Sequence, residues 1–174
     1  LALRKKTLQG VVVTGGEPTL QHDLPQFLHA VKSFGYKIKL DTCGYLPEVL
    51  QKIFAMRVLD YVAMDIKAPY EKYAEITGVT PRLASIKKSI RLILSSSIPH
   101  EFRTTLIDGF HALPDIVAMA KMIQGADAYY LQKFRAAPKL VNPSFAVKRP
   151  PTEAVLHEAA SLCKPYVKMC KIRE

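Results

Sequence analysis

The chain has 174 residues, 49% of them hydrophobic, and a formal net charge of +10. It is too apolar to be disordered, and no apolar run approaches the roughly 20 residues of a membrane-spanning helix. The basic residues are dispersed, with no aromatic-interleaved basic stretch, so we interpret them as solvated faces and expect no nucleic-acid partner. The start is too short in apolar residues for a secretion signal. We expect one domain over residues 1–174, in the cytoplasm and without a membrane partner.

Three cysteines occur, at Cys43, Cys163 and Cys170. Their odd number and wide spacing indicate neither a disulfide framework nor a closed zinc site. We therefore expect reduced thiols and no metal ligands in this chain.

The first third of the chain alternates strand and helix patterns. A β-branched run over 11–14 predicts a buried strand that stops at Gly15-Gly16. A helix follows, with Asp23 as its N-cap and Gly35 at its C-terminal end. Its apolar residues recur at helical spacing: Leu24, Phe27, Leu28, Val31 and Phe34. The pattern then repeats as a strand over 36–41, a helix over 47–57 and a strand over 60–65.

A longer polar connection is expected through Tyr70 and Gly78. The pattern continues with a helix over 83–95, a strand over 101–107, a helix over 114–124, a strand over 128–132, a helix over 152–163 and a strand over 166–172. Four prolines mark an irregular stretch before the last helix: Pro138, Pro143, Pro150 and Pro151. Strands that alternate with helices predict an α/β fold, a parallel sheet or partial barrel with helices outside.

Polar residues close or follow five successive predicted strands. In parallel α/β folds, ligands bind beyond the carboxyl ends of the strands. The residues concerned are Thr14 to Glu17, Asp41, Thr42, Asp65, Lys67, Arg103 to Thr105, and Gln132 to Phe134. Any one of them could simply cap a helix or lie in solvent. Together they predict one polar rim with acidic groups for an amine and a ribose and cationic groups for a carboxylate, without naming the ligand.

The glycine pair is a separate signal. Gly15 and Gly16, followed by Glu17 and Pro18, permit close backbone approach to a ligand and fix a carboxylate beside it. The pair lacks the third glycine of a dinucleotide-binding fingerprint and the Gly-Lys-Ser/Thr of a phosphate loop.

Five ordered motifs resemble the radical S-adenosylmethionine (SAM) superfamily, from about Gly10 to the end. Thr14-Gly15-Gly16-Glu17-Pro18 resembles the turn that contacts the amino group of SAM's methionine part. Four further segments are similar to glycyl-radical-enzyme activases: Leu40 to Tyr45, in which Cys43 replaces the usual Asn; Ala63 to Pro69 with the segment at 73–78 that follows it; Phe102 to Thr105; and Tyr130 to Arg135. The last two resemble the anaerobic ribonucleotide reductase activase subgroup.

The resemblance implies roles for nine residues in SAM binding and assigns no catalytic residue. Gly15, Gly16 and Glu17 would hold the methionine amine. The other six would be Asp41 and Asp65 near the ribose and amine, Lys67 and Arg103 near the carboxylate or the partner's peptide, and Gln132 with Phe134 near the adenine.

One departure from the family is large. Its members bind a [4Fe–4S] cluster through a C-x3-C-x2-C loop after the first barrel strand, and this sequence contains no such triplet. We interpret Cys43 as a small, partly buried thiol rather than a ligand. We expect a partial (β/α)6 radical SAM-type barrel over 1–174, truncated at its N-terminus so that the first βα unit and its cluster loop are missing.

The resemblance implies that the complete protein cleaves SAM reductively and installs a glycyl radical on a partner. The partner would be an anaerobic ribonucleotide reductase or a pyruvate formate-lyase type enzyme, with a flavodoxin or ferredoxin-like electron donor. The cofactors would be SAM and, in the full-length protein, a [4Fe–4S] cluster. Two alternatives stay open: an enzyme like 7-carboxy-7-deazaguanine synthase that acts on a small molecule, and a cluster-free, non-catalytic binding module.

Overall fold

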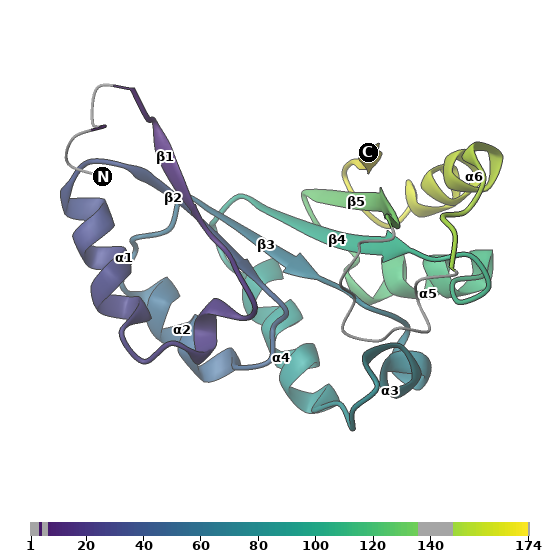
Figure 1. Ribbon diagram of the computed structural model, residues 1–174, viewed down its shortest axis with the longest axis horizontal. Helices are drawn as coiled ribbons and strands as arrows, with labels where there is room; N and C mark the ends of the chain where they lie inside the picture. The colour runs from purple at the N-terminus through teal and green to yellow at the C-terminus, as the bar shows by residue number, and fades with distance from the viewer. Residues whose placement is uncertain (1–3, 5–6, 136–147, 174) are drawn as a thin grey trace. The chain divides into compact units, whose positions relative to one another are not determined.

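The computed structural model describes residue 4, residues 7–135 and residues 148–173 (Figure 1). The chain divides into two compact units. Unit 1 consists of Leu1–Asp65 and Arg82–Glu101, and unit 2 consists of Ile66–Pro81 and Phe102–Glu174. The single domain expected over 1–174 stays a prediction.

Unit 1 is built on three strands with helices on one face. The strands are β1 (Gly10–Val13), β2 (Lys37–Thr42) and β3 (Tyr61–Asp65). The helices are α1 (Leu24–Ser33), α2 (Pro47–Ala55) and α4 (Leu83–Leu94), with a 3-10 helix, η2 (Pro18–Leu20), after β1. β1 pairs with β2 and β2 with β3, both in parallel. In Figure 1, α1, α2 and α4 lie on the same side of these strands.

The core of unit 1 follows from the alternation of side chains along β2. Ile38 and Leu40 are fully buried, whereas Lys39 and Asp41, which alternate with them, are partly exposed. The apolar face packs against α1 and α2 in a cluster that includes Leu28 and other buried residues of both helices. Because successive strand residues point to opposite faces, the face away from these helices carries the polar side chains.

Unit 2 contains the later strands and helices. It contains β4 (His100–Leu106) from Phe102 onward, η3 (Tyr70–Lys72), α3 (Tyr73–Thr77), α5 (Leu113–Met122), β5 (Ala128–Lys133), α6 (Glu153–Cys163) and β6 (Cys170–Arg173). β5 and β6 pair in parallel. Phe102 and Tyr129 are the largest fully buried side chains of this unit. The Thr104 hydroxyl donates to the Ile66 carbonyl at 2.8 Å and lies 2.7 Å from the Tyr129 hydroxyl, so the polar atoms of this core are paired.

The strands follow one another in the order β1-β2-β3-β4-β5-β6, and the predicted α/β fold with parallel strands and helices is confirmed. Most element ends lie within two residues of their predicted positions. Among the described residues, no helix is long and apolar enough to cross a membrane. Pro138 and Pro143 of the predicted irregular stretch lie outside the described residues.

Two predicted segments were wrong in detail. The connection after β3 is not simply polar loop: it forms η3 and α3, because Tyr73 buries its ring and Gly78, with φ of 68°, ends the helix in the left-handed conformation. The last strand was expected from Tyr166 but begins at Cys170. Tyr166 instead accepts a hydrogen bond from the Gly125 N–H, and Lys168 donates to Ala126, so this stretch closes the turn before β5.

Candidate functional site

The turn after β1 leaves its backbone open on one side. Gly15 has φ of 146°, which side chains rarely permit, and a Cβ placed on Gly15 or Gly16 would meet no atom within 4 Å. A side chain at either position would therefore not collide with neighbouring protein atoms. An open glycine backbone at a strand end suits the close approach of a ligand.

Glu17 joins this turn to the end of β2. Its Oε1 accepts hydrogen bonds from the Thr19 N–H at 3.1 Å, the Thr19 hydroxyl at 2.6 Å and the Thr42 hydroxyl at 2.9 Å. Its Oε2 accepts from the Cys43 N–H at 2.6 Å. The carboxylate is the N-cap of η2 and fixes the turn against the segment that follows β2.

Opposing effects act on the Glu17 pKa. Burial raises it, but the hydrogen bonds from Cys43 and Thr19 favour the charged form and outweigh burial, so the pKa lies below its ordinary value. Glu17 is therefore a carboxylate at neutral pH, which suits a cationic ligand group.

A groove of about 650 Å³ runs from this turn along β1. At one end it is lined by Gly15, Gly16 and Glu17, and further along by the β1 valines and by Phe27 of α1. Val12 is 55% exposed and Phe27 is 44% exposed. The groove is therefore formed by the end of β1, the turn, η2 and the start of α1, and Gly15, Gly16 and Glu17 are the predicted SAM contacts within it.

The segment after β2 packs closely. Gly44 has φ of 76°; its N–H donates to the Thr42 hydroxyl at 3.0 Å and its carbonyl accepts from the Ser89 hydroxyl at 2.8 Å. A Cβ on Gly44 would lie 2.9 Å from Met64 Sδ. The glycine is thus required at this position by both backbone conformation and packing.

The polar face of β2 and β3 carries a charged cluster. Lys39 Nζ lies 2.9 Å from Glu101 Oε1 and 3.8 Å from Asp41 Oδ1, and the Tyr61 hydroxyl donates to Glu101 Oε2 at 3.2 Å. The Glu101 side chain is only 3% exposed. Asp41 therefore shares its ammonium partner with a buried carboxylate. Asp65, the last residue of β3, belongs to the same unit and is partly exposed.

Replacing Lys39 with methionine should lower the free energy of unfolding by about 2 kcal/mol, because it leaves Glu101 buried without its cation. Replacing Lys32, whose ion pair with Asp60 is 2.7 Å long but more exposed, should cost less than about 1 kcal/mol. Denaturant unfolding of both variants measures the difference. Equal losses would show that the burial of Glu101 has no energetic effect.

Unit 2 holds Lys67 by its backbone. The Lys67 N–H donates to the Tyr73 hydroxyl at 3.3 Å, and its carbonyl lies 3.0 Å from Nε2 of His111. Arg103 lies in β4, where its carbonyl accepts from the Ile66 N–H at 2.8 Å. Lys67 and Arg103 are thus close along neighbouring backbones, and both side chains are partly exposed.

Gln132 and Phe134 lie at the end of β5. Gln132 pairs with Arg173 of β6, and the Phe134 N–H donates to the Leu106 carbonyl at 3.2 Å. Phe134 is 9% exposed, so most of its ring is covered within the protein. Tyr130 lies two residues before Gln132, and the Arg173 guanidinium is 3.6 Å from the centroid of its ring.

The nine predicted residues fall into two sets. Unit 1 contains Gly15, Gly16, Glu17, Asp41 and Asp65, and unit 2 contains Lys67, Arg103, Gln132 and Phe134. Their convergence on one rim stays a prediction. The sequence placed Thr42 and Cys43 at the end of a predicted strand but did not predict that they donate hydrogen bonds to Glu17. Nothing in the sequence marked His111.

The described residues contain no group of three or more His, Cys, Asp or Glu side chains that could hold a metal ion. The cysteines are free thiols: Cys163 is buried, and Cys43 and Cys170 are partly exposed.

Comparison with known proteins identifies the family. The profile of the radical SAM superfamily matches residues 1–123. The chain belongs to the radical SAM superfamily. Members of this superfamily use SAM and a [4Fe–4S] cluster, as the resemblance implied.

Two relatives come from Methanocaldococcus jannaschii, and the name glycyl-radical enzyme activating enzyme is given to both by inference. MJ1227 is 32% identical over 169 residues, which cover 94% of this chain and 70% of MJ1227. MJ1632 is 30% identical over 131 residues, which cover 71% of this chain and 48% of MJ1632. The chain therefore spans about half to two thirds of the length of these relatives.

Among solved structures, a domain of the pyruvate-formate lyase-activating enzyme of Bacteroides vulgatus has a similar fold. It matches with a TM-score of 0.75 and 20% identity, over 95% of this radical SAM chain and 99% of that one. At this identity the likeness concerns the fold.

Proposed function

We propose that this chain supplies the SAM-binding part of a radical SAM activase that installs a glycyl radical on a partner enzyme. The observation that carries the proposal is the open Gly15-Gly16 backbone beside the ionised Glu17 carboxylate at a strand end. The names of the M. jannaschii relatives support the activase type.

The residues of the turn fit the methionine end of SAM. A protonated amine needs acceptors, and the glycine carbonyls and Glu17 supply them without a side chain in the way. In a protein that held both groups, SAM and a [4Fe–4S] cluster would supply the radical chemistry, and the residues of this turn would hold the methionine end of SAM. The cysteines of this sequence do not fit that cluster, because they contain no C-x3-C-x2-C triplet. No reaction step is assigned to them.

The other residue roles are part of the same proposal. Asp41 and Asp65 face the ribose and amine, Lys67 and Arg103 the carboxylate or the partner's peptide, and Gln132 and Phe134 the adenine. The partner is a glycyl radical enzyme of the anaerobic ribonucleotide reductase or pyruvate formate-lyase type, and a flavodoxin or ferredoxin-like protein supplies the electron.

SAM binding by the 174-residue chain tests the amine site. Because the cluster iron is not available as an anchor, binding should be weak, so NMR spectra are recorded with millimolar SAM. The amides of Gly15, Gly16 and Glu17 should shift, and Gly16→Val should abolish those shifts by filling the open side of the turn. Ala30→Val, on an exposed position of α1, is the matched control and should leave them unchanged. Unchanged amides at the turn in the native chain would reject the amine site.

The same chain should not cleave SAM, even after reconstitution with iron and sulfide under reducing conditions. The reason is the lack of three suitably spaced thiolates to hold a cluster with one open iron. Deoxyadenosine is measured by chromatography, and its formation above the level of a protein-free control would contradict this prediction. With a longer protein that contains this chain and a cysteine triplet, a glycyl radical detected on the partner by electron paramagnetic resonance would separate the activase from small-molecule radical chemistry.

A further inference from the structure

His111 is a buried histidine held on both sides of its ring. It is 6% exposed. Its Nδ1 accepts a hydrogen bond from the Ile107 N–H at 3.1 Å, and its Nε2 lies 3.0 Å from the Lys67 carbonyl. Because a backbone N–H can only donate and a carbonyl can only accept, the ring must be neutral with its proton on Nε2.

This ring connects two segments that carry proposed SAM contacts within unit 2. On one side it holds the carbonyl of Lys67, whose N–H is bound by the buried Tyr73 hydroxyl. On the other side it holds Ile107, the residue after Leu106, and the Leu106 carbonyl accepts from the Phe134 N–H. Side-chain hydrogen bonds therefore hold both the N–H and the carbonyl of Lys67.

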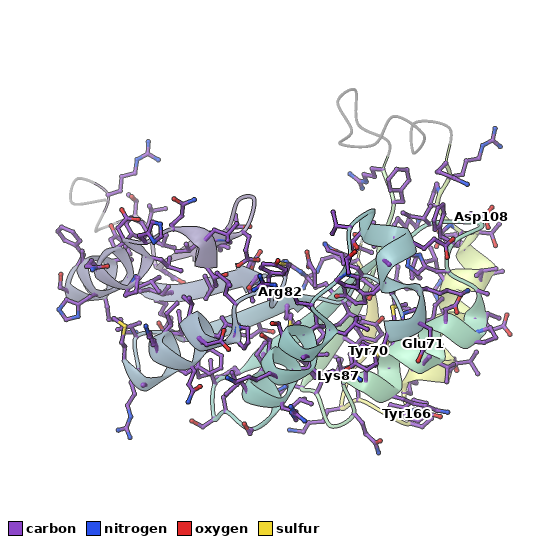
Figure 2. The ribbon with its side chains drawn as sticks, turned by 90° about the horizontal axis from the view of Figure 1, so that it is seen from below. Tyr70, Glu71, Arg82, Lys87, Asp108 and Tyr166 are labelled. Carbon is purple, nitrogen blue, oxygen red and sulfur yellow. The ribbon has the colours of Figure 1, made fainter. Side chains whose placement is uncertain are left out.

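An ion pair at the surface connects η3, which follows Lys67, with α5, which follows His111. Lys72 Nζ, at the end of η3, lies 2.8 Å from Asp115 Oδ2 of α5, which also accepts from the Ala112 N–H at 3.0 Å. Figure 2 labels Tyr70 and Glu71, which precede Lys72, and Asp108, on the turn that leads to His111. This contact is more exposed than the imidazole and does not depend on its proton.

We propose that His111 is a positioning residue that sets the Lys67 backbone for ligand contact and does so only while its imidazole is neutral. The proposal rests on the role of Lys67 in the proposed function. A second proton would make Nδ1 a donor facing the Ile107 N–H donor, so that hydrogen bond must break on protonation. The Nε2–H remains a donor, so Lys67 loses its positioning because the ring must move away from the Ile107 N–H and its contact with the Lys67 carbonyl moves with it.

The charges around His111 oppose one another. Burial is the largest influence and lowers its pKa; the backbone contacts and the Asp115 charge raise the pKa, and the Lys72 charge lowers it, with a net shift below the ordinary value of 6.5. The Lys148 ammonium lies against the turn before His111, 4.8 Å from the centroid of the Phe110 ring. Since the folded state binds this proton less tightly than the unfolded state, the His111 contribution to stability is complete above pH 6.5. It is lost as the pH falls toward the folded-state pKa.

Hydrogen exchange of single amides in the 174-residue chain tests the positioning directly. Rates are corrected for the intrinsic effect of pH and compared at pH 7.5 and at a pH below the folded-state pKa of His111, which NMR titration of its ring protons measures. In the native chain, the Ile107 amide should exchange at least 10-fold faster at the lower pH, while Leu131 in β5 stays protected. Equal protection of Ile107 at both pH values would overturn the proposal.

Two amide substitutions separate the two contacts of the ring. In His111→Asn the amide oxygen can take the place of Nδ1, so Ile107 should stay protected at both pH values while the Lys67 and Lys72 amides exchange about 10-fold faster. In His111→Gln the amide nitrogen can take the place of Nε2, so the Lys67 and Lys72 amides should keep their protection and Ile107 should lose it. If both variants loosen both segments equally, His111 is a packing residue and the positioning role is wrong.

NMR spectra recorded with SAM at the two pH values distinguish this proposal from the proposed function. With millimolar SAM, the Lys67 amide of the native chain should shift at least 2-fold less at the pH below the His111 pKa than at pH 7.5, and this change should vanish in His111→Gln. A Lys67 response that has the same pH dependence in both proteins would overturn the role of His111 in ligand contact. If SAM shifts no amide of the turn at Gly15 to Glu17, the proposed function fails, whereas the exchange rates still decide whether His111 positions Lys67.

Discussion

Replacing Glu17 with alanine should lower the free energy of unfolding by about 3 kcal/mol, because four donors from three residues lose their charged acceptor together. The donors on Thr42 and Cys43 come from the end of β2, so the turn after β1 would also separate from that strand end. Chemical denaturation measures the loss. NMR with SAM should show no response at Gly15 and Gly16 in this variant.

Two further variants test whether the loss of stability in Glu17→Ala comes from these hydrogen bonds. Glu17→Gln keeps an oxygen for Thr19 and Thr42 but places an amide NH₂ against the Cys43 N–H, so it should cost about 1–2 kcal/mol. Glu48→Ala is the control, because Glu48 is an exposed residue in the first turn of α2 and its ion pair with Lys88 lies at the surface. It should cost less than about 1 kcal/mol. A Glu17→Ala variant as stable as Glu48→Ala would show that the four hydrogen bonds contribute nothing.

The Glu17 contribution should also depend on pH. Its folded-state pKa lies below the ordinary value of 4.5, so the stabilisation is complete above pH 4.5 and is lost as the pH falls through the folded-state pKa. The stability difference between the native chain and Glu17→Ala should therefore narrow on acidification below pH 4.5. Unfolding curves over this range measure it, and a constant difference would contradict the pKa shift.

Replacing Gly44 with alanine should cost about 3 kcal/mol, the sum of a left-handed backbone and an overfilled site. The new Cβ would approach Met64 Sδ to 2.9 Å and Ser89 Cβ to 3.1 Å, and both side chains are fully buried. The terminal methyl of Met64 lies closest to the new Cβ, and because Met64 and Ser89 are both buried, it would have to shift within the core.

Gly78 provides the matched control for this substitution. Its φ of 68° is close to the 76° of Gly44, but a Cβ there would meet nothing within 4 Å. Gly78→Ala should therefore cost only the backbone strain, about 1 kcal/mol. The difference between the two variants in denaturant unfolding measures the packing at Gly44. Equal losses would show that Met64 and Ser89 yield without cost.

The fold was largely predictable because it depends on local patterns. The period of apolar residues and the placement of Asp23 and Gly35 predicted the alternating strands and helices to within a few residues. The failures occurred where a single contact replaced a pattern. Tyr73 stabilises a five-residue helix by burying one ring. The Gly125 N–H donates to the Tyr166 carbonyl, so Tyr166 belongs to this turn and not to the last strand.

The candidate site was predictable only in part. The turn at Gly15 to Pro18 was visible in the sequence because a glycine pair with a following carboxylate is a local motif. Its internal bonding was not, because the Thr42 and Cys43 donors lie 25 and 26 residues from Glu17. The parallel register of β1 on β2 brings them together.

The sequence by itself therefore determined the α/β succession, the motif that marks the radical SAM superfamily and the lack of a cysteine triplet. All three are properties of order and spacing along the chain. Only the tertiary structure decided which groups Glu17 binds, why Gly44 has no room for a side chain, and that His111 holds Lys67. The physical reason is the same in each case: hydrogen bonds and van der Waals contacts act over a few ångströms, and strand register and packing bring residues 20 to 45 positions apart within that range.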